Sequence, residues 1–316
     1  MIGFKSIYNL IMLKFAGLIL IIAASFSASM AFAGNDKGHC RQIYDTDADI
    51  EVASNNEISS KYINAIKSRS MDSLDPFQLL FVKNHKEALD RKLGNGFDIN
   101  SCGGLFNSSL LGLAALMGQM DDIKTILEYG ADLEFPRDSA GQSPLMLAIS
   151  ANRYDVANYL IKRGAKLKSA YGNEYEYSAL NVLARSMKDK SRNEMKELDL
   201  ARKLMSSGLS ANTIDKNPNV WMTPLMSAII SDKPGLVKLF LECGADPYIK
   251  DKRGNDSFHF ARTIDSFDAA KNMQKREKML DILQKPRPAS NSCKVTSNNS
   301  ERFGAALRIW PKLVVF

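Results

Sequence analysis

One short motif, Ser143-Pro144-Leu145-Met146-Leu147-Ala148, recurs along the chain in altered form. The residues equivalent to Ser143 follow one another at spacings of 34, 34, 35, 45 and 33; they are Asp75, Ser109, Ser143, Ser178, Thr223 and Asp256. A second landmark, a glycine, comes 21 residues after the first in four copies and 30 residues after it in the copy that begins at Ser178. These glycines are Gly96, Gly130, Gly164, Gly208 and Gly244. A period in this range indicates stacked supersecondary units.

The third copy shows what one unit should form. Ser143 can cap a helix whose first turn holds Pro144, where the missing N–H removes no hydrogen bond that the helix needs. A second apolar stripe at helical spacing ends at Gly164, which can adopt a positive φ. The pattern therefore predicts a turn, a helix, a turn and a second helix. Neither helix can bury its apolar side alone, so the copies must stack.

These copies resemble ankyrin repeats. Thr223-Pro224-Leu225-Met226-Ser227-Ala228, followed by Gly244-Ala245-Asp246, is closest to the family pattern. The likeness covers residues 75–284 and implies an all-α ankyrin-repeat solenoid of about six helix-turn-helix repeats. The family histidine remains only as His259. Other residues replace it in four copies, which predicts fewer side-chain hydrogen bonds between neighbouring turns; they are Gly112, Met146, Asn181 and Met226.

Residues 1–33 have the composition of a secretory signal peptide: a positive start, an apolar run and Ala31-Phe32-Ala33 as a cleavage site. The alternative is an uncleaved membrane anchor, but the small residues at its end favour cleavage and no stable membrane insertion afterwards. We expect a periplasmic protein. Residues 34–74 should form an N-terminal segment with a capping helix, and residues 285–316 a C-terminal tail that folds back on the last repeat or contacts a partner.

Export makes the cysteines informative. The chain has four, Cys40, Cys102, Cys243 and Cys293, so two disulfides are possible in an oxidising compartment. Cys40 with Cys102 is the favoured bridge because both lie at the amino end. The alternative is unpaired thiols, with Cys243 simply tolerated beside Gly244.

The net charge of +7 does not indicate nucleic-acid binding. The excess lies in residues 1–33 and 285–316, so residues 34–284 have no net charge. The three histidines, His39, His85 and His259, have no second ligand at metal spacing. No nucleophile elbow or phosphate-binding glycine loop is present. We therefore predict no catalytic residue, no metal and no cofactor.

The turns between repeats display aromatic residues, which make effective anchors at interfaces because they bury much area at small entropic cost. The alternative is that Tyr177 and Trp221 pack beneath their own turns. The nine extra residues of the fourth copy, around Met187–Met195, should lengthen a helix or form a loop. The candidate partner-binding residues are Tyr171, Tyr175, Tyr177, Trp221 and Met222, together with Arg137 and Arg253.

The resemblance implies a non-enzymatic protein that binds one protein partner. Exported bacterial ankyrin proteins include immunity proteins that neutralise toxic effectors, such as phospholipases delivered by type VI secretion, and proteins that support periplasmic oxidative-stress enzymes. A scaffold or assembly factor of the cell envelope is the alternative, and a catalytic protein with an unrecognised site is a third.

Overall fold

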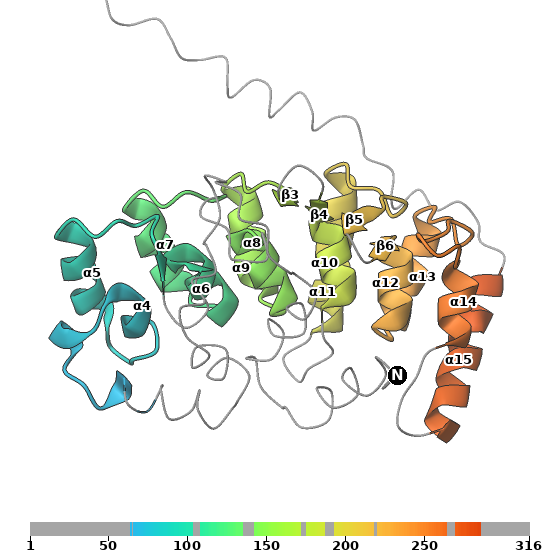
Figure 1. The fold of residues 1–316 in the computed structure, drawn as a ribbon, viewed down its shortest axis with the longest axis horizontal. Helices are drawn as coiled ribbons and strands as arrows, with labels where there is room; N and C mark the ends of the chain where they lie inside the picture. The colour runs from blue at the N-terminus through green and yellow to red at the C-terminus, as the bar shows by residue number, and fades with distance from the viewer. Residues whose placement is uncertain are drawn as a thin grey trace, which may run out of the picture.

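The computed structural model describes residues 64, 66–103, 108–134, 142–171, 175–186, 193–217, 220–263 and 269–285. In these residues, pairs of helices follow one another in a row (Figure 1). The predicted signal peptide, residues 34–63 of the N-terminal segment, Arg137 and tail residues 286–316 lie outside the described residues. Ile66, from the predicted capping helix, is helical and buried in the core.

The described part of the chain contains six consecutive helix pairs. The first helices of the pairs are α4 (Pro76–Leu79), α6 (Leu110–Met117), α8 (Pro144–Ser150), α10 (Ala179–Arg185), α12 (Pro224–Ile230) and α14 (Ser257–Arg262). The second helices are α5 (Lys86–Gly94), α7 (Met120–Glu128), α9 (Tyr154–Lys162), α11 (Glu194–Ser206), α13 (Pro234–Glu242) and α15 (Ala269–Gln284). A short 3-10 helix, η2 (Met71–Ser73), precedes them. The two helices of each pair contact one another, as the repeat pattern predicts.

Both sequence landmarks have the predicted local structure. Every residue equivalent to Ser143 is the N-cap of a first helix, and its side chain accepts a hydrogen bond from the backbone N–H three residues later. Each second-landmark glycine has a positive φ, for example 97° at Gly164 and 96° at Gly208. The phase of the repeat is therefore fixed at both ends of the first five helix pairs.

The first helices stack into one continuous core. α6 contacts α8, α8 contacts α10, α10 contacts α12, and α12 contacts α14. The small residues at the inner position are fully buried, and Leu183 is buried at the same position in the fourth copy; the small residues are Ala114, Ala148, Ala228 and Ala261. Each repeat thus buries its apolar side against its neighbours, as expected of a solenoid.

Short strand pairs, which the helical periodicity did not predict, join some of the repeats. They are β1 (Cys102–Gly103) with β2 (Ser108–Ser109), β3 (Lys168–Tyr171) with β4 (Tyr175–Ser178), and β5 (Asp215–Asn217) with β6 (Val220–Met222). All three pairs are antiparallel. β4 also contacts β5, so the second and third strand pairs lie side by side.

The expectation of few side-chain hydrogen bonds between turns is wrong, because other polar residues supply them. Asn100 Oδ1 accepts from Asp132 N at 2.9 Å, and Asn212 Oδ1 accepts from Asp246 N at 2.8 Å. In the fourth copy, Asn181 donates to backbone carbonyls of the next turn. These bonds connect one turn to the next along the row.

The insertion in the fourth copy lengthens the second helix in part. α11 has 13 residues, whereas α7, α9 and α13 each have nine. Residues 187–192 lie outside the described residues. Among the described helices, none has the length and apolar character needed to cross a membrane.

Both cysteines in the described residues are disulfide-bonded. The alternative in which Cys243 is an unpaired thiol is therefore wrong. Cys40 lies outside the described residues, so its pairing with Cys102 stays a prediction.

Candidate protein-binding surface

The strand pair β3–β4 brings three predicted partner-binding residues together. Tyr171 is the direct partner of Tyr175 in the antiparallel register, and Ser169 is the partner of Tyr177. The register therefore places Tyr171 and Tyr175 directly opposite each other, with Tyr177 two positions further along β4. The three tyrosines, which span seven positions in the sequence, therefore lie on two hydrogen-bonded strands.

The next strand pair places Trp221 beside a cation. Trp221 pairs with Lys216 in the register, and 39% of its surface is exposed. Lys252 Nζ lies 5.9 Å from the centroid of the Trp221 ring, within cation–π range. Met222 is partly buried, and its carbonyl oxygen accepts a hydrogen bond from Asn181 Nδ2 at 3.3 Å. The strand that carries the exposed Trp221 is therefore held at its backbone by the side chain of Asn181.

Arg253 lies on the turn that follows, next to Lys252, and both are exposed. The Asp251 carboxylate accepts from Arg253 N and Asn255 N, each at 2.8 Å, which closes this turn. The turn that places Lys252 beside the ring of Trp221 therefore carries a second exposed basic residue, Arg253. Arg137 lies outside the described residues, so the structure does not relate it to this cluster.

Sequence reasoning missed Lys252 and Tyr248. Tyr248 is 67% exposed, and its ring lies 5.4 Å from that of Phe258. In the preceding repeat the equivalent position holds Asn212, which bonds the next turn. The signal in the sequence is that Tyr248 stands at a turn position where the preceding copy has an asparagine.

Asp215 connects the third strand pair to the helix beneath it. Its Oδ1 accepts from Ser178 N at 3.1 Å. Burial raises the pKa of the Asp215 carboxyl to about 6, although the Asn181 amide, the Arg185 charge and the Ser178 hydrogen bond oppose this shift. The carboxyl group is therefore a structural link whose charge depends on pH.

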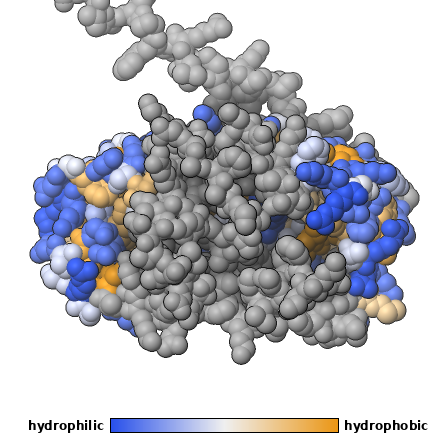
Figure 2. Space-filling model, in the orientation of Figure 1, coloured by the Kyte–Doolittle hydropathy of each residue, from blue (hydrophilic) through white to orange (hydrophobic). Residues whose placement is uncertain are grey.

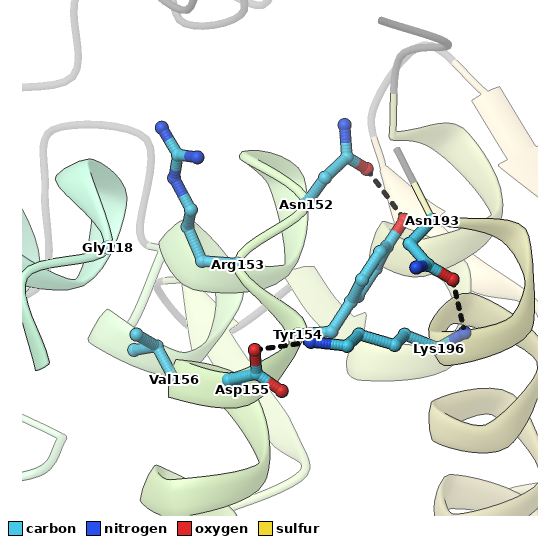
Figure 3. Close-up of a pocket in the computed structure, with 8 residues that line it drawn as sticks. All are labelled: Gly118, Asn152, Arg153, Tyr154, Asp155, Val156, Asn193 and Lys196. Atoms are coloured by element: carbon cyan, nitrogen blue, oxygen red, sulfur yellow. Dashed lines mark hydrogen bonds and ion pairs between the residues drawn. The ribbon is translucent and has the colours of Figure 1, made fainter. Parts of the chain in front are cut away.

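A polar depression of about 360 Å³ lies where the turn between α8 and α9 meets the start of α11 (Figure 3). Its charged groups are engaged with one another or with the backbone: Lys196 Nζ is 2.6 Å from Asp155 Oδ2, and Arg153 Nε donates to Leu116 O. Tyr154 Oη donates to Asn152 Oδ1 at 2.9 Å. The depression therefore contains no arrangement of nucleophile and base. Among the described residues, no group of three or more His, Cys, Asp or Glu side chains could hold a metal ion.

On the face drawn in Figure 2, the surface at both ends of the row is mostly hydrophilic, with smaller hydrophobic areas between hydrophilic residues. A partner that binds such a surface must use a few aromatic anchors within a polar rim rather than one broad apolar patch. The turns with Tyr171, Tyr175, Tyr177 and Trp221 have this composition. Their role in binding stays a prediction.

Stacked helix pairs with polar, aromatic turns define a repeat solenoid of the protein-binding class. The chain contains ankyrin repeats: the profile described as "Ankyrin repeats (3 copies)" matches residues 79–170, and that described as "Ankyrin repeat" matches residues 221–252. Such repeats are protein–protein interaction modules, generally without catalytic activity.

The chain is similar to several curated proteins. It is 24% identical over 184 residues to the phosphocholine transferase AnkX of Legionella pneumophila, covering 58% of this chain but only 18% of that relative. It is 26% identical over 180 residues to the putative ankyrin repeat protein YahD of Escherichia coli, covering 48% of this chain and 87% of YahD. It is 44% identical over 52 residues to protein phosphatase 1 regulatory subunit 27 of Homo sapiens, covering 16% of this chain and 33% of that relative. The small share of AnkX that is matched leaves most of that enzyme without a counterpart in the alignment.

Proposed function

We propose that this chain is an exported, non-enzymatic protein that binds one protein partner in the periplasm. The partner would be a toxic secreted effector, such as a phospholipase, which the chain neutralises as an immunity protein. The sequence of residues 1–33 supports export. The disulfide bonds at Cys102 and Cys243 support an oxidising compartment.

The arrangement of Trp221 carries the proposal for the binding surface. Its ring is exposed beside Lys252, on a strand whose neighbour Met222 is held by Asn181. An aromatic ring on a fixed backbone loses little conformational entropy on binding. The adjacent strand pair with Tyr171, Tyr175 and Tyr177 extends this surface over a second turn.

A capture experiment tests the surface. Residues 34–316, exported with a leader and a C-terminal tag, should recover one specific partner from periplasmic extract. Trp221→Ala combined with Tyr175→Ala should weaken that complex at least tenfold, the loss expected when an interface anchor is truncated. Met195→Ala is the matched control, because Met195 is 77% exposed at the start of α11, away from these turns. Equal recovery by the double variant and the wild type would refute the proposed surface.

Inhibition distinguishes an immunity protein from a scaffold. The captured partner should lose its enzymatic activity as the purified chain approaches one equivalent, and cells that lack the chain should be killed by periplasmic expression of the partner. A partner that binds at one equivalent and keeps its full activity would instead identify a scaffold of the cell envelope.

A further inference from the structure

Cys102 and Cys243 cannot be bonded to each other, although both are disulfide-bonded. Cys102 lies in β1, before α6, and Cys243 is the C-cap of α13. α7, α9 and α11 separate them along the row (Figure 1). Packed helices lie about 8–10 Å apart, so these two cysteines are about 30 Å or more from each other. A disulfide requires Cα atoms within about 7 Å.

Each of the two must therefore bond to one of the remaining cysteines, Cys40 or Cys293. Cys293 follows Lys285, the last described residue, by eight positions. Eight extended residues span at most about 29 Å. From the end of α15 to Cys102 the row contains α13, α11, α9 and α7, a distance of about 40 Å at ordinary helix packing. Cys293 cannot reach Cys102.

Cys243, in contrast, lies close to where α15 ends. α15 packs against α13, and both are the second helices of neighbouring pairs, so they run in the same direction. The carboxyl end of α15 thus lies beside the carboxyl end of α13, which Cys243 caps. One helix spacing of about 10 Å separates the two ends, well within reach of the eight residues before Cys293.

We propose that Cys243 bonds Cys293 and that Cys40 bonds Cys102, so that each terminal segment is joined covalently to the end of the array nearest to it. The terminal repeats of a solenoid have a neighbour on one side only and are the first to separate from the stack. Each bond stabilises the end of the array that lacks a neighbouring repeat, because it closes a long loop and so lowers the entropy of the unfolded chain. Each bond forms by loss of two protons and two electrons from a thiol pair, which a protein disulfide of the oxidising compartment accepts.

Peptide mapping tests the pairing directly. The protein is exported with its leader, alkylated, and digested with trypsin without reduction. The sequence predicts one linked pair of peptides, 38–41 with 93–124, and a second pair, 239–250 with 279–294. Peptide 38–41 linked to 239–250, or alkylated thiols at these cysteines, would overturn the proposal. The result does not depend on any partner, so it is independent of the capture experiment.

Thermal unfolding tests the role of each bond. The double variant Cys243→Ser with Cys293→Ser should lower the midpoint of unfolding by about 5–15 °C. The double variant Cys40→Ser with Cys102→Ser should do so as well, and 10 mM dithiothreitol should lower the midpoint of the wild type but not that of the fourfold variant.

Hydrogen exchange locates the effect: loss of the Cys243 bond should speed exchange in α14 and α15, and loss of the Cys102 bond in α4 and α5. Uniform acceleration in both doubles would refute a local constraint.

Discussion

Lys233 Nζ lies 2.8 Å from Glu197 Oε1, and neither side chain is exposed to solvent. The ammonium group also donates to Leu183 O at 2.8 Å and to Ser186 Oγ at 2.7 Å, so oxygen atoms of three residues lie within 2.8 Å of it. These contacts join α10, α11 and the start of α13. The ion pair therefore connects the fourth repeat, which carries the insertion, to the fifth.

Removal of the cation should be costly. Lys233→Met keeps the length of the side chain but removes the cation beside the buried Glu197 carboxylate, so we expect the free energy of unfolding to fall by about 3–5 kcal/mol. Urea denaturation of the purified chain measures this. Lys238→Met is the control. Lys238 is exposed, and its Nζ lies 3.9 Å from Glu242 Oε1, which is a long contact, so its loss should lower the free energy of unfolding by less than about 0.5 kcal/mol.

The double variant Lys233→Met with Glu197→Leu should recover most of the lost stability, because a buried ion pair is often no better than apolar side chains of similar volume. A double variant as unstable as Lys233→Met alone would show that the lysine acts mainly through α10.

Asp215 should make stability depend on pH between about 4 and 6. Burial raises the pKa of its carboxyl to about 6 from an ordinary value of 3.8, so the folded state binds the proton more tightly than the unfolded state. The stabilisation that protonated Asp215 contributes is present below about pH 4 and is lost as the pH rises to about 6. Over this range the free energy of unfolding falls by about 3 kcal/mol. Asp215→Asn should therefore raise the free energy of unfolding at pH 7.5 by about 1–3 kcal/mol and change it little at pH 4.

The test compares urea denaturation of this variant and the wild type at both pH values. Asp246→Asn is the matched control, because Asp246 is exposed. A gain of equal size at pH 4 and pH 7.5 would show that the charge of Asp215 is not the cause.

His85 should add a second pH dependence with the same sign. Its Nε2 lies 3.0 Å from Asp122 Oδ1, and its Nδ1 faces Val82 O, so both ring nitrogens face acceptors. The hydrogen bond to Asp122 raises the pKa of His85 despite the opposing effect of burial. The stabilisation is fully present below pH 6.5 and is lost as the pH rises through the raised value. His85→Gln should flatten the fall in the midpoint of unfolding between pH 6 and pH 8, and thermal scans at half-unit intervals would detect it. An unchanged slope would contradict the assignment.

The helical framework could be predicted from the sequence because each of its signals is local. Ser109, Ser143 and Thr223 cap helices that begin at the next residue, and the glycine that follows each of the first five second helices has a positive φ. These signals need only the order of residues within one repeat, and six copies reinforce one another.

The contacts between repeats could not be predicted in the same way. The sequence alone favours surface positions for Lys233 and Glu197, because a fully buried lysine or glutamate is rare. Only the stacking of repeats places the two side chains together. The strand pairs were missed because β5 and β6 have three residues each, too few to show a period of two. The neighbouring positions of Tyr171, Tyr175 and Tyr177 depend on that register. Lys252 was missed because its contact with Trp221 joins two turns.

Asn181 should control the turn that carries Trp221. It stands where the family pattern has histidine, donates to Thr213 O and Met222 O, and accepts from Ser227 Oγ at 3.3 Å. Asn181→Leu keeps the size of the buried side chain but removes these partners, so we expect a loss of about 1–3 kcal/mol.

The loss should be concentrated at the turn. Amide exchange in β5 and β6 should accelerate more than exchange in α4 to α7, and the complex with the partner should weaken even though residue 181 is buried. Asn181→His, which restores the family residue, should retain more of the protection. Met226→Leu is the control, since Met226 holds the same position in the next copy and is fully buried, and it should cost less than about 1.5 kcal/mol. Equal acceleration at both ends of the array in Asn181→Leu would indicate general destabilisation and refute a specific link between Asn181 and the Trp221 turn.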